Sequence, residues 1–86
     1  MLNFPNESRS YDSTRRCVRF WGHDGALEVS FSVEVAALLR MAPGTKHDAL
    51  AVLESFDANR PRILKVARTV YARRRKGTYA LLASDF

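Results

Sequence analysis

The stretch RCVRFWGHDGALEVSFS, residues 16–32, decides the fold of this 86-residue chain. Apolar and polar residues alternate on both sides of Asp-Gly at 24–25, a dipeptide that supplies the positive backbone angles of a tight turn. The pattern therefore predicts a β-hairpin with these two residues as its turn. The cross-strand pairs that follow from this turn are Phe20 with Val29 and Val18 with Phe31.

The opposite face of this hairpin carries the polar positions and one large aromatic side chain. Trp21 lies there with Ser30, and Arg19 and Glu28 are expected close enough across the strands to pair. An exposed tryptophan needs cover from a helix, another strand or a partner. We therefore take Arg19, Trp21 and Glu28 as a candidate protein interface.

The two ends of the chain predict further strands. LNF at 2–4 alternates and is stopped by Pro5, as expected of an edge strand. Residues 6–14 are polar and predict a loop. The apolar segment TYALLASDF, residues 78–86, predicts a closing strand.

The middle of the chain predicts helices. VEVAALLRM at 33–41 repeats apolar residues at helical spacing, with Ser32 as its cap. TKHD at 45–48 has the form of a capping box and predicts a helix over 46–56, with Thr45 and Asp48 as the paired capping residues.

FDANRPR at 56–62 interrupts this helical pattern. Asp57 is a candidate cap for a following helix, while Pro61 falls late in its first turn. Two arrangements stay open: two helices over 46–56 and 58–75, or one helix kinked at Pro61. The later segment is amphipathic and stops at Gly77.

These elements predict one α+β domain over residues 1–86. We expect a mostly antiparallel sheet of about four strands, made by the N-terminal strand, the hairpin and the C-terminal strand. Two to three helices should cover one face.

The net charge of +5 is concentrated in one segment. Residues 58–76 carry eight cations and no acid, so this segment contributes +8 and the rest of the chain −3. Clustered Lys and Arg are typical of phosphate binding, although cations are also favoured at the end of a helix. Tyr71 and Tyr79 flank the run and could stack on bases, although the position of Tyr71 on the apolar face favours a place in the core. The candidate nucleic-acid contacts are Arg62, Lys65, Arg68, Arg73, Arg74, Arg75 and Lys76.

Arg60 points toward the apolar side of its predicted helix, where an unpaired charge is costly. We expect a structural ion pair with a carboxylate, and the candidates are Asp57, Asp85 and the C-terminal carboxylate.

The sequence favours neither catalysis nor metal binding. His23 and Asp24 adjoin in a turn, but no nucleophile or second base is evident. Cys17 is expected to be a half-covered structural thiol. One Cys and two isolated His have no metal-ligand spacing, and nothing indicates a cofactor.

The segments LNFP, CVRFWGHDG, LEVSFSVE, FDANR and LLASDF together resemble a family of short bacterial proteins. That family is catalogued as the domain of unknown function numbered fourteen-eighty-eight, and the resemblance runs from Leu2 to Phe86. It implies a small cytoplasmic α+β protein and assigns no site. Asp57, Asn59, Arg60 and Asp85 resemble family features without an assigned role.

The N-terminus lacks the features of a signal peptide, and the longest apolar runs are far shorter than the roughly 20 residues that span a bilayer. We therefore expect a cytoplasmic protein without a membrane partner. Its most favoured function is non-enzymatic, as a protein-interaction or regulatory module, with a homodimer as one arrangement because small domains gain from self-association. The alternative is a nucleic-acid-binding accessory protein. The sequence names neither the partner nor the process.

Overall fold

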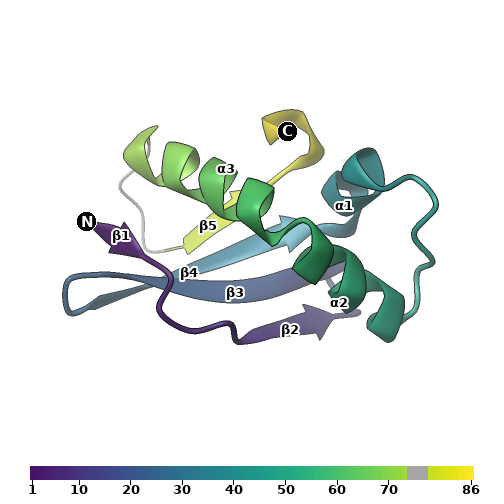
Figure 1. Cartoon of the computed structure of the whole chain (residues 1–86), viewed down its shortest axis with the longest axis horizontal. Helices are drawn as coiled ribbons and strands as arrows, with labels where there is room; N and C mark the ends of the chain where they lie inside the picture. Colours follow the sequence, from purple (N-terminus) through teal and green to yellow (C-terminus); the bar gives the residue numbers. More distant parts are fainter. Residues whose placement is uncertain (74–77) are drawn as a thin grey trace.

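The computed structural model describes residues 1–73 and 78–86 and has the expected α+β fold (Figure 1). One mixed sheet carries three α-helices on one of its faces. In chain order the elements are β1 Leu2–Asn3, β2 Arg9–Asp12, β3 Cys17–Asp24, β4 Leu27–Glu34, α1 Val35–Met41, α2 Ala49–Ala58, α3 Arg60–Arg73, β5 Thr78–Leu81 and the 3-10 turn η1 Ala83–Asp85.

The sheet has the strand order β1-β3-β4-β5, and β2 also pairs with β3. The strands β1 and β2 follow each other along the same edge of β3, both antiparallel to it. The opposite edge is β5, which runs parallel to β4. The sheet is therefore mostly antiparallel, as predicted.

The hairpin forms, but its predicted register is wrong by two residues. Asp24 pairs with Leu27, so Gly25 and Ala26 make the turn, with Gly25 at a φ of 62°. A glycine with positive φ at the first central position suits a two-residue hairpin turn as well as the predicted Asp-Gly arrangement does. A shift by two leaves every side chain on its predicted face. The observed pairs include Phe20 with Phe31 and Val18 with Val33.

The prediction of a loop over residues 6–14 is also wrong, because residues 9–12 form β2. This strand pairs with β3 from Cys17 to Phe20. It places Arg9 and Tyr11 on the helix-covered side of the sheet, opposite Phe20 and Val18.

The predicted helix starts need correction. Ser32 does not cap α1, because β4 continues through Glu34 and Ser32 pairs with Arg19. The expected capping box is absent, since Asp48 alone caps α2 by accepting from the backbone N–H of Ala51 at 2.9 Å. The hydroxyl of Thr45 instead donates to the carbonyl of Ala42 at 2.7 Å.

Of the two arrangements left open for residues 46–75, the structure has two helices. They are separated at Asn59, whose side-chain amide donates to the carbonyl of Ser55 at 2.8 Å. Asp57 lies inside α2 and is not a cap. Pro61 is the second residue of α3, where a missing N–H leaves no helical hydrogen bond unmade.

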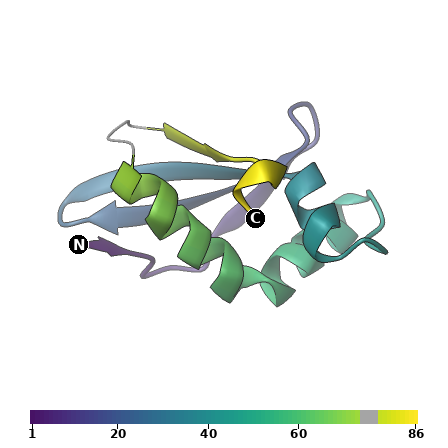
Figure 2. The ribbon, with the colours of Figure 1, turned by 90° about the horizontal axis from the view of Figure 1, so that it is seen from above.

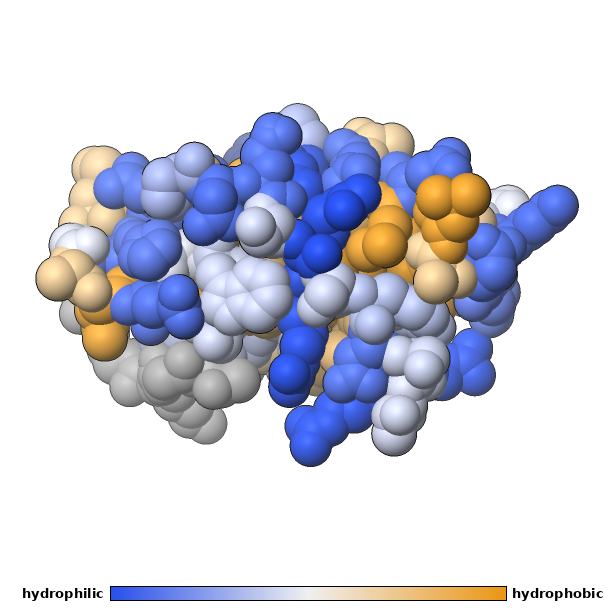
Figure 3. Space-filling model, turned by 90° about the horizontal axis from the view of Figure 1, so that it is seen from below, coloured by the Kyte–Doolittle hydropathy of each residue, from blue (hydrophilic) through white to orange (hydrophobic). Residues whose placement is uncertain are grey.

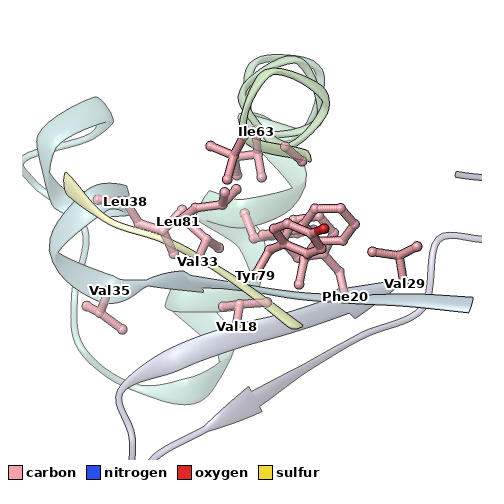
Figure 4. Close-up of a cluster of buried hydrophobic side chains, with 14 of the residues drawn as sticks. Val18, Phe20, Val29, Val33, Val35, Leu38, Ile63, Tyr79 and Leu81 are labelled. Atoms are coloured by element: carbon pink, nitrogen blue, oxygen red, sulfur yellow. The ribbon is translucent and has the colours of Figure 1, made fainter. Parts of the chain in front are cut away.

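The core lies between the sheet and the helices (Figure 4). Phe20 and Phe31 stack with ring centroids 5.3 Å apart, and Tyr79 of β5 stacks on Phe31 at 5.4 Å. Ile63 of α3 and Leu38 of α1 close the cluster from the helix side. The predicted strand over 78–86 ends at Leu81, and η1 then turns the chain back beside α3 (Figure 2).

Candidate functional site

One face of the sheet is left open, since the described helices all lie on the other face (Figure 1). Trp21 lies on this open face opposite Ser30, and Arg19 lies opposite Ser32. Figure 3 shows the molecule from this side, largely covered by hydrophilic groups with a few apolar side chains among them. We call this surface the open face and define it by Arg19, Trp21, Ser30, Ser32 and Ala80.

A shallow hollow of about 280 Å³ lies on the open face. Trp21 and Cys17 line it, and the guanidinium side chains of Arg15 and Arg19 stand beside them. Cys17 is only 7% exposed, and its burial, followed by the charge of Asp12, raises the pKa of its thiol. The two arginines oppose that shift without reversing it. The thiol therefore stays protonated near neutral pH and is a poor nucleophile.

The predicted closeness of Arg19 and Glu28 is wrong. Glu28 lies opposite His23, four positions along β3 from Arg19. At about 3.3 Å per residue, four positions separate the two side chains by about 13 Å. Both are exposed on the same side of the sheet, with Glu28 near the hairpin turn.

Arg60 is paired with Asp57, and a second arginine joins them. Nη2 of Arg60 donates to Oδ1 of Asp57 at 3.0 Å, and its guanidinium lies 4.9 Å from the centre of the Phe56 ring. Arg9 of β2 binds the same carboxylate with two hydrogen bonds, from Nε to Oδ1 at 2.9 Å and from Nη2 to Oδ2 at 2.7 Å. This cluster fastens α2 and the start of α3 to the edge strand β2.

The shared carboxylate has a lowered pKa. The hydrogen bond from Arg9 is the main cause, and the bond from Arg60 acts in the same direction against partial desolvation. The same pairing raises the pKa of Arg9. Sequence reasoning missed Arg9 because its partner lies 48 positions away and its strand has no clear alternation.

Asp85, the other predicted partner of Arg60, lies elsewhere. Its Oδ2 accepts from the backbone N–H of Leu82 at 2.8 Å and so closes the turn η1. The carboxylate of Asp85 therefore accepts its hydrogen bond from within the segment that follows β5.

The candidate nucleic-acid contacts divide between two sides of α3. Arg62, Lys65 and Arg73 line a groove between α3 and the C-terminal segment. Arg68 lies on the other side, 5.2 Å from the centre of the Phe4 ring. Arg74, Arg75 and Lys76 lie outside the described residues.

The two tyrosines beside the basic run face the interior. Tyr79 is 1% exposed and stacks on Phe31. Tyr71 is half-buried, contacts Tyr79 edge to face and donates from its hydroxyl to Oδ2 of Asp24 at 2.6 Å. The ring of Tyr79 is therefore not open to a base, and the hydroxyl of Tyr71 is engaged with Asp24.

The other side chains considered for catalysis or metal binding do not come together in one site among the described residues. His23 and Asp24 are neighbours in β3, but Asp24 binds the N-terminal ammonium group at 2.9 Å as well as Tyr71. No group of three His, Cys, Asp or Glu side chains able to hold a metal ion occurs in residues 1–73 and 78–86. Among the same residues, no helix is long and apolar enough to cross a membrane.

The fold and its surfaces define a small α+β domain whose mixed sheet has helices on one face and an open second face. The chain belongs to the family described as protein of unknown function DUF1488, whose model matches residues 2–82. No curated protein and no solved structure matches the chain.

Proposed function

We propose that this protein is a non-enzymatic protein-interaction module that self-associates through the open face of its sheet. The observation that carries the proposal is the half-buried Trp21 at the middle of a sheet face that no described helix covers. Tryptophan is enriched at the centre of protein interfaces, where its large ring is removed from water.

The neighbours of Trp21 suit a flat contact with a second sheet. Ser30, Ser32 and Ala80 are small, so a facing surface can approach the backbone closely. Arg15 and Arg19 also line this patch and supply polar groups beside Trp21. A second copy would bring an identical patch, as a two-fold interface requires.

Two features support a binding role over catalysis. The protonated, nearly buried thiol of Cys17 is a weak nucleophile on the open face. The carboxylate of Asp57 is bound by two arginines, Arg9 and Arg60, and is not directed toward a substrate. An enzyme needs poised titratable groups in one pocket, which neither residue provides.

The experiment uses the chain's single tryptophan as a reporter of the open face. We would record sedimentation velocity and tryptophan emission over a range of protein concentrations, at low and moderate salt. Self-association should raise the sedimentation coefficient and shift the emission to shorter wavelength together, and moderate salt should leave both changes in place.

Two variants locate the contact. Ser30→Arg places a long cation opposite Trp21 and should keep the protein monomeric, with emission that no longer depends on concentration. Ser8→Arg makes the same exchange at an exposed position between β1 and β2 and should behave as the wild type. A wild-type protein that is monomeric at every concentration, or a Ser30→Arg variant that associates normally, would overturn the proposal.

Nucleic-acid binding through the basic face of residues 58–76 is the less favoured alternative. Arg68 lies away from the other described cations, and Tyr71 and Tyr79 are engaged inside the fold. This alternative predicts affinity that falls steeply as salt rises. Anisotropy measurements with labelled RNA and DNA over a salt series test it.

A further inference from the structure

A groove of about 810 Å³ runs between α3 and the C-terminal segment, on the helix side of the molecule and away from the open face. One wall is the exposed side of α3, and the other is formed by Ser84 and Asp85. Figure 2 shows the two segments side by side above the sheet.

The α3 wall carries an unbalanced positive charge. Arg62, Lys65 and Arg73 all line the groove and are exposed, and none of them makes an ion pair with a described residue. Thr69 lies between them and adds a hydroxyl group. From residue 62 to residue 73 the helix rises by about 16 Å, so these cations form a stripe along the groove.

The floor of the groove is apolar. Val66 and Phe86 are half-buried, Val70 is almost fully buried, and Pro61 closes one end. The guanidinium of Arg62 lies 6.0 Å from the centre of the Phe86 ring, so the cationic wall and the aromatic floor meet at this point. A ligand that fills the groove would contact charge on one side and hydrocarbon below.

We propose that the groove binds an acidic segment of a partner protein that also carries apolar side chains. Glu or Asp side chains would pair with the cationic stripe, while alternate apolar side chains would cover Val66, Val70 and Phe86. An extended segment of about five residues spans 16 Å at about 3.3 Å per residue. This site is separate from self-association through the open face and does not depend on it.

The same observations favour a polypeptide over a nucleic acid. The floor is aliphatic apart from Phe86, whose ring already contacts Arg62, so successive bases find no stacking platform. The carboxylate of Asp85 stands on the facing wall, where it disfavours a closely spaced row of phosphates. An acidic peptide can place its apolar side chains toward that wall.

The test is fluorescence anisotropy with the full chain and four labelled probes. The first is a peptide of alternating glutamate and leucine, and the second replaces leucine by serine at equal charge. The third and fourth are single-stranded RNA and duplex DNA. We expect the glutamate–leucine peptide to bind at least about fivefold more tightly than the glutamate–serine peptide, because only leucine covers the apolar floor.

Two double variants of equal charge assign the binding to the groove. Arg62→Ala with Lys65→Ala should weaken binding of the glutamate–leucine peptide about tenfold. Arg40→Ala with Lys46→Ala removes the same charge from exposed positions outside the groove and should change it by less than about twofold. Circular dichroism of both variants checks that the fold is kept.

Each other outcome overturns the proposal. Binding of the nucleic acids without the peptide would make the stripe a phosphate contact. Equal binding of both peptides would mean that the groove attracts them by charge alone. No binding at low salt would mean that the cationic stripe is only a solvated helix face. Sedimentation of the Arg62→Ala and Lys65→Ala variant should match the wild type, which keeps this result distinct from that of the open face.

Discussion

Replacing Asp57 with Asn removes the carboxylate that Arg9 and Arg60 share, with almost no change in volume. The carboxylate is 42% exposed and the side chain of Arg9 is 32% exposed, so water screens the pair. Exposed ion pairs contribute about 0.2–1 kcal/mol, and two parallel hydrogen bonds place this pair at the upper end of that range. Arg60 is 17% exposed and would lose its carboxylate as well. We therefore expect Asp57→Asn to lower the free energy of unfolding by about 1–2 kcal/mol at pH 7.

The effect should depend on pH with a definite sign. The folded protein lowers the pKa of Asp57, so the unfolded chain binds more protons in acid. The contribution of this carboxylate is therefore complete above its unfolded pKa of about 3.9 and is lost as the pH falls through the lower folded pKa. Wild type and Asp57→Asn should converge in stability in strong acid.

Urea denaturation followed by tryptophan emission measures both effects. A double-mutant cycle with Arg9→Ala isolates the pair, and its coupling energy should exceed about 0.5 kcal/mol. Glu54→Gln is the matched control, because Glu54 is an exposed carboxylate on the same helix. The reasoning is refuted if Asp57→Asn is as stable as the wild type at pH 7, or if its deficit is unchanged in acid.

Three further predictions concern other parts of the molecule. An added Cβ at Gly22 would approach the backbone oxygen of Asn3 to 3.0 Å, so Gly22→Ala should displace β1 and cost about 1–3 kcal/mol in urea denaturation; an unchanged midpoint would contradict this contact. The buried thiol of Cys17 should react slowly with Ellman's reagent in the native protein and fast in urea, whereas equal rates would mean that the open face does not shield it. Tyr71→Phe removes the hydrogen bond to Asp24 and should cost about 1 kcal/mol in the same urea assay, and a more stable variant would argue against that bond.

The hairpin and the composition of the core could be predicted because alternation alone assigns side chains to faces. Phe20, Val29 and Phe31 are buried as expected, although the register differs by two residues. Gly25 is compatible with either of two adjacent turns, and the sequence contains no local feature that selects one.

The strand β2 could not be predicted, because its residues Arg9–Asp12 include one aromatic and three polar side chains. Its extended conformation depends on pairing with β3 and on the contact between Arg9 and Asp57, both of which are tertiary. The predicted start of α1 was wrong for a related reason. Ser32 is a good helix cap in isolation, but its pairing with Arg19 keeps it in β4.

The candidate surfaces were predictable to different degrees. The position of Trp21 on the face away from the core follows from alternation within one strand. The groove beside α3 does not, because its second wall is brought there by the return of residues 84–86 after β5. Helical periodicity placed Arg68 with the other cations, while its contact with Phe4 depends on the path of the N-terminal segment.

The parallel pairing of β4 with β5 has a consequence for how the chain reaches its native state. These neighbouring strands are separated in sequence by all three helices. Residues 30–33 of β4 therefore cannot form their hydrogen bonds with β5 until residues 78–81 have been synthesised. During synthesis the hairpin and helices emerge from the ribosome first, and Phe31 stays without the ring of Tyr79 until translation has passed that residue. Closing so long a loop carries an entropic cost that makes this step slow relative to hairpin formation. A nascent chain of this protein therefore exposes part of its future core until β5 has been synthesised, and that interval is when it most needs protection from aggregation.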